Sequence, residues 1–579
     1  MHFTIRHTAV TIQSTVFDLT PGIKSWFRAR RLFSHDNLLC ATQISPLYTC
    51  LINLQDLYSE NQSPTKTNKP HLISPGNTSS SSAREMDPER ATPCASPSYK
   101  IYLSDEAIKS IICRSLPDVK EDQITIEQLG SGKSFNNRIY YVDLSQPTSI
   151  CRPTWSGDGV DISRNPKREQ ISSLVLKVAG FPFGGAKIQN ELACLLLLEK
   201  YCPSIPTPEL VAWSEDGRRI KTPIDTRGSR ERSLSVPTQL KTLSIDDDST
   251  SAREETADQG WLLMTRAPGR TITHADLSGA QGASIMHQIA EHVATWRHAL
   301  PATRTVGNMR LIGRNSIPPA SATLYDKAIL PGLDVYIDGI ITKPTSPSPL
   351  KTYLEYITHI LRANLRTLKN CKLLQRNEER VNAIVRQFIK DTLSKLSLLH
   401  GKSKAANMVF THYDISPRNV LVSPVGHVHG DAANSNSNVA VAVSAVIDFE
   451  FAGFYPAAEE FTHTVENSHS EWTVPLFGEF LSELDRREAL PACLAEHISS
   501  ESEPMDGVEV EFGQDEHIPF GGPDFHQAVL LHRVAANIAP WWIKEESELS
   551  EDELKSELDG AKMRIENAVK MLGKMVEKK

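Results

Sequence analysis

The sequence predicts an α+β fold of two lobes, in which a small antiparallel sheet forms an N-lobe and a mainly helical C-lobe follows it. Short β-prone runs, two of them joined by a glycine-containing loop, occupy residues 124–178. Beyond residue 265, apolar residues recur at helical spacing instead. We therefore place the N-lobe at residues 99–264 and the C-lobe at residues 265–579.

The composition favours a globular protein that binds neither nucleic acid nor the membrane interior. Apolar residues make up 40% and charged residues 23% of the 579 residues, which is ordinary for a chain that buries a core. A formal net charge of -8 argues against the broad basic face that nucleic acid requires. The apolar run at 439–447 is far shorter than the roughly 20 residues of a membrane helix. We expect no nucleic acid and no stable membrane insertion, and the composition leaves the oligomeric state open.

Residues 1–98 are expected to lie outside the folded lobes. The first 35 residues hold five arginines and lysines against one acidic residue, which is typical of a mitochondrial transit peptide and equally compatible with a disordered extension. Residues 60–98 are rich in Ser, Thr, Pro and Asn, a composition too poor in apolar groups to pack.

Nine scattered cysteines without a C-x-x-C pair indicate reduced thiols. We expect a cytoplasmic protein, with a mitochondrial location as the alternative.

The N-lobe elements follow one another in a regular order. A helix is predicted over 104–115, with Ser104 as its cap, and strands over 124–129, 139–144 and 173–178. A strong helix follows at 187–200 before Pro203, then a strand around Val211 and another at 261–264. Residues 215–259 are polar, charged and without periodicity, so we interpret them as a disordered insertion.

The C-lobe is predicted to combine helices with a few short strands. One helix carries Ile285, Ile289, Val293 and Trp296, and a second carries Val381, Ile384, Phe388 and Leu396. Strands at 408–410 and 420–422 flank a polar loop, and a third at 443–447 ends at an acidic residue. Residues 430–438 are a surface insertion rich in Asn and Ser. An apolar stripe from Leu554 to Met575 favours a helix that packs on this lobe.

The polar loop at 411–422, with the sequence Thr-His-Tyr-Asp-Ile-Ser-Pro-Arg-Asn-Val-Leu-Val, has the spacing that phosphoryl transfer needs. Asp414 and Asn419 lie five residues apart, so that one carboxylate meets an incoming hydroxyl while an amide oxygen reaches a metal on the phosphates. Asp448 follows the strand at 443–447, within the metal-strand segment 443–450 that reads Val-Ser-Ala-Val-Ile-Asp-Phe-Glu, and supplies a carboxylate to the same cation. Magnesium prefers such oxygen ligands.

These two segments resemble those of aminoglycoside phosphotransferases and of choline or ethanolamine kinases, through their His-x-Asp-x-x-x-x-Asn and Ile-Asp-Phe-Glu motifs. The resemblance covers residues 124–460 and rests on the order of several motifs rather than on any single one. It implies a bilobal protein-kinase-like fold, with ATP between the lobes and Mg²⁺ held by Asn419 and Asp448. A protein kinase is the nearest rival, but this chain has His-Tyr-Asp and Asp-Phe-Glu and no A-P-E segment.

A lysine and a glutamate upstream complete the phosphate side of the predicted site. Lys177 lies in an apolar strand, and Glu191 falls in the next helix, fourteen residues later. The resemblance implies that Lys177 holds the α- and β-phosphates and that Glu191 fixes this lysine. A cation gains far more from a phosphate in a dry cleft than in water, provided that a partner orients it. Either residue taken alone would be interpreted as a surface charge.

Two backbone segments complete the predicted nucleotide site. The loop Gly130-Ser131-Gly132 precedes the Lys177 strand, as a phosphate-covering loop should, and glycine lets backbone N–H groups approach anionic oxygens. It departs from the G-x-G-x-x-G pattern of protein kinases. The resemblance places the hinge between the lobes at residues 264–267, where backbone groups of Thr265 and Ala267 would bind adenine. From these residues alone, a plain strand and turn is an equal interpretation.

Three polar residues beside the motifs remain open. We expect His412 to be a structural hydrogen-bonding residue rather than a general base, because a loose transition state asks mainly for orientation of the hydroxyl. Arg418 pairs either with a phosphate or, as we expect, with a neighbouring carboxylate. Glu450 is either a second metal contact or a wall of the acceptor pocket.

The sequence thus predicts an ATP-dependent transferase that moves the γ-phosphoryl group to a hydroxyl of a small molecule. The alternative outside the enzymes is a catalytically silent nucleotide-binding scaffold of the same fold. Nothing in residues 271–404 spells out the acceptor. Choline would call for an aromatic and acidic cage, for which Tyr325, Tyr336, Tyr353, Tyr356 and Trp541 are available, although scattered aromatic residues usually belong to the core.

Overall fold

The structure is a computed structural model of the chain. It describes residues 97–98, 101–130, 134–151, 155–156, 159–160, 168–181, 183–223, 259–313, 323–330, 333–341, 345–399, 408–425, 440–462, 472–495, 521–540, 543 and 549–577. Residues 1–96 of the predicted extension, residues 224–258 of the predicted insertion at 215–259, and the tract at 430–438 lie outside the described residues. The predicted disorder is wrong for residues 215–223, because Lys221 forms a β-bridge with Trp213. All described residues belong to one unit.

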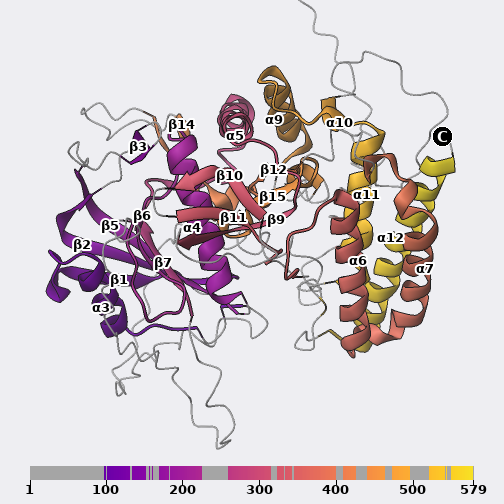
Figure 1. Cartoon of the computed structure of the whole chain (residues 1–579), viewed down its shortest axis with the longest axis horizontal. Coiled ribbons are helices and arrows are strands. Elements are labelled where there is room, and N and C mark those ends of the chain that lie inside the picture. Colours follow the sequence, from indigo (N-terminus) through magenta and orange to yellow (C-terminus); the bar gives the residue numbers. More distant parts are fainter. Residues whose placement is uncertain are drawn as a thin grey trace, which may run out of the picture. The chain divides into compact units, whose positions relative to one another are not determined.

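A five-stranded antiparallel sheet forms the N-lobe (Figure 1). Its strands, in spatial order, are β1 (Ile124–Gln128), β2 (Asn137–Cys151), β5 (Arg168–Ala179), β7 (Trp261–Thr265) and β6 (Leu210–Ser214). Two short strands, β3 (Trp155–Ser156) and β4 (Gly159–Val160), pair with each other. Helix α3 (Asp105–Ser115) begins at Ser104, whose side chain accepts a hydrogen bond from the backbone N–H of Ala107. The apolar face of α3 packs on the sheet through Ile108, Ile111 and Ile112, because these residues share one side of the helix.

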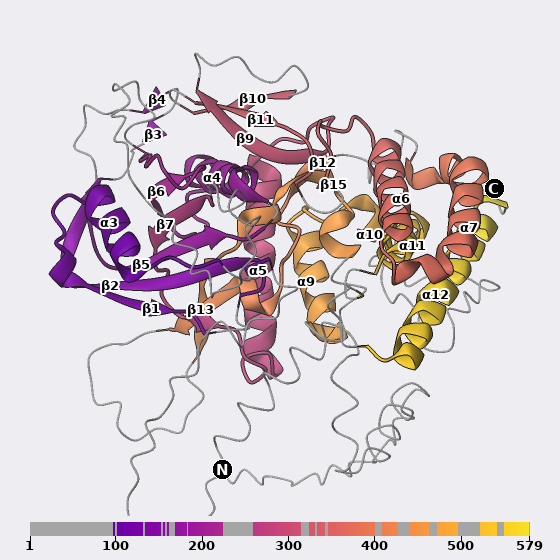
Figure 2. The same ribbon diagram turned by 90° about the horizontal axis from the view of Figure 1, so that it is seen from below.

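Helix α4 (Gly184–Tyr201) connects the two lobes. It packs against β5, β6 and β7 of the N-lobe and also against β9 (Gly307–Gly313) of the C-lobe, as both views show (Figure 2). Most of its residues from 187 to 198 are buried, which is the pattern of a helix covered on several sides. The buried amide of Asn190 fixes this position. It donates to the carbonyls of Glu450 and Ala452 (2.9 Å each) and accepts from the N–H of Met309 (2.6 Å).

The C-lobe contains most of the helices. These are α5 (Gly279–Ala299), α6 (Tyr353–Asn370), α7 (Glu378–Asp391), α9 (Val474–Arg486), α10 (Ala492–Ala495), α11 (Pro523–Ile538) and α12 (Glu551–Glu577). Helices α6, α7, α11 and α12 lie side by side in both views, and α12 packs on α11 and α7 (Figures 1 and 2). The described residues include no helix with the length and apolar character of a membrane span.

Two further sheets complete the C-lobe. The larger contains, in spatial order, β10 (Thr323–Leu330), β11 (Leu333–Ile337), β9, β15 (Gly453–Pro456) and β12 (Met408–Thr411). The smaller consists of β14 (Val441–Val446), β13 (Val420–Pro424) and β8 (Arg270–Thr271). The candidate catalytic loop connects β12 of one sheet with β13 of the other, so both sheets position it.

The α+β prediction is confirmed, and each predicted helix and strand corresponds to an element of the structure. The bounds differ, because β2 and β5 extend well beyond the predicted runs. The prediction that one helix reaches Leu396 is wrong: α7 ends at Asp391, and short 3₁₀ turns at Leu393–Lys395 and Ser397–Leu399 surround Leu396. The sequence did not predict strands β9, β10, β11 and β15 or helix α6.

Replacing Asn190 with leucine is expected to lower the free energy of unfolding by about 3 kcal/mol, because the Glu450 carbonyl and the Met309 N–H lose the Asn190 amide as a partner. The Ala452 carbonyl retains a hydrogen bond from Asn308. Urea unfolding followed by circular dichroism measures this loss. Asn382→Leu is the control, since that amide bonds only to Glu378 and Arg386 of its own helix, α7. Equal midpoints for the two variants would contradict the bridging role of Asn190.

Candidate active site

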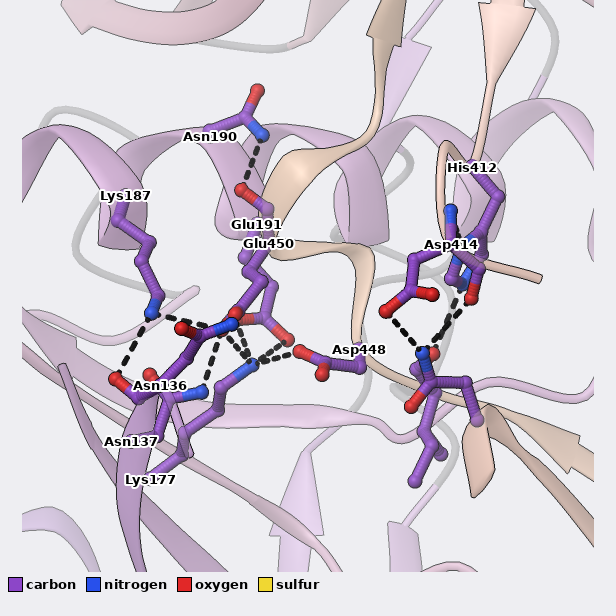
Figure 3. Close-up of polar contacts among 12 residues, drawn as sticks. Asn136, Asn137, Lys177, Lys187, Asn190, Glu191, His412, Asp414, Asp448 and Glu450 are labelled. Atoms are coloured by element: carbon purple, nitrogen blue, oxygen red, sulfur yellow. Dashed lines mark hydrogen bonds and ion pairs between the residues drawn. The ribbon is translucent and has the colours of Figure 1, made fainter. Parts of the chain in front are cut away.

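The candidate active site centres on the ammonium group of Lys177, which lies on β5. Its Nζ donates to both carboxylate oxygens of Glu191 (2.9 and 2.7 Å) and to Asp448 Oδ1 (2.6 Å), as Figure 3 shows. Glu450 Oε2 lies 2.9 Å from the same nitrogen. Although burial opposes the charged form, the carboxylates of Asp448, Glu191 and Glu450 raise the pKa of Lys177 well above its ordinary value. Lys177 on β5 is therefore a fixed cation, held by carboxylates from α4 and from the segment 448–450.

Glu450 points inward, toward the N-lobe. Its Oε2 accepts a hydrogen bond from Asn137 Nδ2 (2.6 Å) and also lies 3.1 Å from Lys187 Nζ. Burial opposes ionisation, but the two lysines hold the pKa of Glu450 well below its ordinary value. Because its carboxylate is 1% exposed, Glu450 does not form a wall of an open acceptor pocket.

Asp448, the predicted metal ligand, lies two residues beyond the end of β14 and directly before a 3₁₀ turn at Phe449–Phe451. Its backbone is left-handed, with a φ of 67°, a conformation that costs energy in a residue other than glycine and is common at functional sites. Oxygens of Asp448, Glu191 and Glu450 lie within 4.8 Å of one another. Asp448 is the most exposed of the three, with a side chain that is 29% exposed.

The catalytic loop holds Asp414 and Asn419 against each other. Asn419 Nδ2 donates to the Asp414 carbonyl (2.9 Å) and to its Oδ2 (3.0 Å), and Arg418 Nη2 donates to Oδ1 (2.5 Å). The amide oxygen of Asn419 therefore faces away from Asp414 and remains suitable for a metal. The Asp414 side chain is 25% exposed, so a substrate hydroxyl can reach it.

The backbone of Ile447 joins these two groups of residues. Its N–H donates to the Asn419 carbonyl (2.9 Å), and its carbonyl lies 3.0 Å from His412 Nε2. Since Asp448 follows directly, the metal strand and the catalytic loop share one hydrogen-bonded connection. Lys177 contacts Asp448 directly and Asn419 contacts Asp414 directly. The backbone of Ile447 connects these two pairs of side chains.

His412 occupies a structural position in this arrangement. The ring is buried against Trp296 and Phe449, and its Nδ1 accepts the N–H of Asp414 (3.3 Å). Both ring nitrogens are therefore engaged with the backbone. Arg418 pairs with the carboxylate of Asp414, which is the second of the two options that the sequence left open.

The structure describes only some of the residues that were predicted to bind the nucleotide. Gly130 is exposed at the end of β1, and Ser131 and Gly132 lie outside the described residues. Thr265 ends β7, and its N–H donates to the Glu209 carbonyl (2.8 Å), so only the carbonyl of Thr265 remains for adenine. Ala267 follows at a partly exposed position.

Four polar residues of the site escaped the sequence analysis. Lys187, Asn137 and Asn190 contact Glu450 or its backbone, and Glu460 accepts the N–H groups of His412 (2.9 Å) and Tyr413 (3.2 Å). One signal was present for Lys187, which lies four residues before Glu191 and hence on the same helical face. The others are lone polar residues without a motif.

A cluster of buried tyrosines lies behind the catalytic loop. The hydroxyls of Tyr353 and Tyr356 donate to Glu459 (2.7 and 3.3 Å), and Tyr413 stacks near Tyr455 with ring centroids 4.7 Å apart. The rings of Tyr353 and Tyr356 are almost wholly buried, so they belong to the core. Tyr336 is also buried, and the side chains of Tyr325 and Trp541 lie outside the described residues.

A buried cation held by carboxylates, next to an Asp–Asn loop, is the arrangement that the resemblance to phosphotransferases of the kinase-like fold predicted. Residues 167–497 match the phosphotransferase enzyme family APH. This stretch covers more than half of the chain, and the chain belongs to that family. Its members are small-molecule phosphotransferases. Among curated proteins, none matches this sequence.

Several solved structures are similar to this chain at low identity. An ADP-bound aminoglycoside phosphotransferase, APH(2'')-Ib, is 10% identical over 81% of this chain and 99% of its own, with a TM-score of 0.40. A choline kinase from Cryptosporidium parvum Iowa II is 10% identical over 81% and 97%, with a TM-score of 0.36. A Plasmodium vivax ethanolamine kinase is 9% identical over 77% and 82%, with a TM-score of 0.34.

Glu459 should make stability depend on pH. Burial raises its pKa from 4.5 to about 7, so the folded state binds more protons than the unfolded state between these values. The stability of the wild type relative to Glu459→Gln should therefore fall by about 3 kcal/mol as pH rises from about 4.5 to about 7, and stay constant above.

Urea unfolding of both proteins at pH 5 and pH 8 measures this difference. The exposed Glu379 of α7 provides the control, because Glu379→Gln should show the same small difference at both pH values. A Glu459→Gln difference that is independent of pH would show that the Glu459 carboxyl titrates normally.

Proposed function

We propose that this chain transfers the γ-phosphoryl group of ATP to a hydroxyl group of a small molecule, with Mg²⁺ as the cofactor. The contact of Lys177 with Asp448 and Glu191 carries this proposal. It puts a permanently charged cation beside the proposed metal ligand, in a drier environment than the surface offers, where an anionic triphosphate is bound strongly.

The residues on the phosphate side hold and orient ATP. Lys177 binds phosphate oxygens while Glu191 keeps its ammonium in place, and the loop at Gly130 covers the phosphates from the N-lobe. Backbone groups of Thr265 and Ala267 bind the adenine edge.

The oxygen ligands available at this site fit a magnesium ion. Asp448 offers a partly exposed carboxylate, and Asn419 offers an amide oxygen that faces away from Asp414. These are the hard oxygen ligands that Mg²⁺ prefers, together with water and phosphate oxygens. When bound, Mg²⁺ neutralises the negative charge that develops on the transferred group.

Asp414 orients the acceptor. It accepts a hydrogen bond from the acceptor hydroxyl and aims its oxygen at the γ-phosphorus. The new oxygen–phosphorus bond forms as the bond between that phosphorus and the β–γ bridging oxygen breaks, and the hydroxyl proton passes to the Asp414 carboxylate. ADP and a phosphate monoester leave. Asn419 and Arg418 hold the Asp414 carboxylate in one orientation, which supports this role.

The acceptor is proposed as a class, a small molecule with a free hydroxyl. Tyr353 and Tyr356 are engaged with Glu459 inside the core, and this argues against them as walls of a choline cage. A library of hydroxyl-bearing metabolites, screened for acceptor-dependent ADP release by the full chain, identifies the substrate.

Asp414→Asn should reduce magnesium-dependent ATP turnover with that acceptor by a factor of about 10² to 10⁴, because the amide cannot take the hydroxyl proton. ATP affinity should change little, since Asp414 faces the acceptor. Coupled ADP detection and calorimetry measure the two quantities. Asp559→Asn, at an exposed position of α12, is the control. Equal, negligible turnover in wild type and variant with intact ATP binding would favour a silent nucleotide-binding scaffold.

Removing magnesium with EDTA should abolish turnover and reduce ATP affinity. Asp448→Asn should raise the Mg²⁺ concentration needed for half-maximal ATP binding by about tenfold or more, because a neutral amide oxygen replaces a carboxylate ligand. Titration of ATP binding at graded Mg²⁺ measures the shift. An unchanged magnesium requirement in Asp448→Asn would remove Asp448 from the metal site.

A further inference from the structure

The side chain of Lys187 lies fully buried near the start of helix α4, outside the motifs discussed in the sequence analysis. It has 0% exposure, whereas lysines almost always keep their ammonium group in water. Its Nζ lies 3.1 Å from Glu450 Oε2 and donates to the Asn136 carbonyl (3.2 Å), as Figure 3 shows. The rings of Phe183 and Phe451 flank it, with centroids 5.1 and 5.5 Å from Nζ. Burying an ammonium group in this way costs free energy that its contacts must offset.

The charges around Lys187 show what it balances. Three carboxylates, those of Glu191, Asp448 and Glu450, gather within 4.8 Å, and Lys177 contacts all three. Lys187 contacts only Glu450 among them. Glu450 Oε2 therefore shares its charge between two ammonium groups, and Asn137 supplies a third donor to the same oxygen (2.6 Å).

The way Glu450 shares its charge affects Lys177, the lysine proposed to bind phosphate. The ammonium of Lys177 has three N–H donors, and four carboxylate oxygens compete for them within 2.9 Å. Binding a phosphate oxygen requires that one of these contacts loosens. Without Lys187, the full charge of the buried Glu450 would fall on Lys177 and pull it away from the nucleotide.

Lys187 also connects the site to the glycine loop. Asn136, whose carbonyl accepts from Lys187, directly precedes β2, and the same carbonyl accepts the N–H of Gly180 (3.0 Å) at the end of β5. One ammonium group thus joins the base of the loop that follows Gly130, the start of α4 and the segment after Asp448.

We propose that Lys187 is a positioning residue that neutralises Glu450 so that Lys177 remains available to the phosphates of ATP. This inference rests on the proposed function above. A positioning role differs from a packing role in one respect. If Lys187 positions Lys177, the loss of nucleotide affinity on replacing Lys187 depends on the charge of Glu450.

A double-mutant cycle tests this dependence in the full chain, with the affinity for the non-hydrolysable analogue Mg–AMP-PNP measured by calorimetry, so that no acceptor is needed. Lys187→Met should weaken binding by about tenfold or more. The same substitution in a Glu450→Gln background should weaken it by less than about threefold, because the charge that captures Lys177 is then absent. Lys200→Met, in the last turn of the same helix, should leave binding unchanged.

Lys187→Gln provides a second variant that removes the charge but keeps a hydrogen-bond donor. If circular dichroism shows that Lys187→Met does not fold, Lys187→Gln replaces it in the cycle. The expected losses of affinity are the same: about tenfold or more in the wild-type background and less than about threefold in the Glu450→Gln background. Equal losses in the wild-type and Glu450→Gln backgrounds would overturn the proposal and leave Lys187 a packing residue. Wild-type protein that does not bind Mg–AMP-PNP at all would instead overturn the proposed function.

Discussion

The ion cluster around Lys177 is the interaction on which the rest of the site depends. Taking an ammonium group or a carboxylate out of water costs several kcal/mol for each ion, and only close pairing offsets that cost. Lys177 comes from β5, Glu191 from α4, and Asp448 and Glu450 from the segment after β14. Because each buried charge needs the others, the cluster joins these three elements to one another.

The catalytic loop depends on the same segment through its backbone. The peptide groups of Ile447 bind both Asn419 and His412, so any displacement of Asp448 is transmitted to the loop. Tyr413 and Asp448 both adopt left-handed backbones, with φ values of 73° and 67°. Such conformations persist only where neighbouring contacts fix them, and here Glu460 fixes Tyr413 through its N–H while Lys177 fixes the Asp448 carboxylate.

The sequence predicted those parts of the protein in which a local pattern decides the structure. Strand β5 and helix α4 have continuous apolar runs, and the spacing of Asp414 and Asn419 is dictated by the chemistry itself. Strands β9 and β11 were not predicted, because a strand's pairing partners can be distant in the chain. Strand β9, for example, lies between β11 and β15. Lys187 and Asn137 escaped for a related reason. A single lysine or asparagine in a sequence indicates a surface position, and only the tertiary contacts with Glu450 reverse that interpretation.

Different interactions stabilise the two sides of the site. The neighbouring residues Glu459 and Glu460 illustrate the side behind the catalytic loop. Glu460 accepts backbone N–H groups of the catalytic loop, while Glu459 accepts hydroxyls from α6. Behind this loop the buried contacts are hydrogen bonds and stacked rings, whereas on the phosphate side they are ion pairs. Ion pairs tolerate no change of charge, because a lost partner leaves a buried ion. Hydrogen bonds between tyrosines and carboxyl groups tolerate more change, because losing one hydroxyl donor leaves no buried ammonium or carboxylate group without its ion-pair partner.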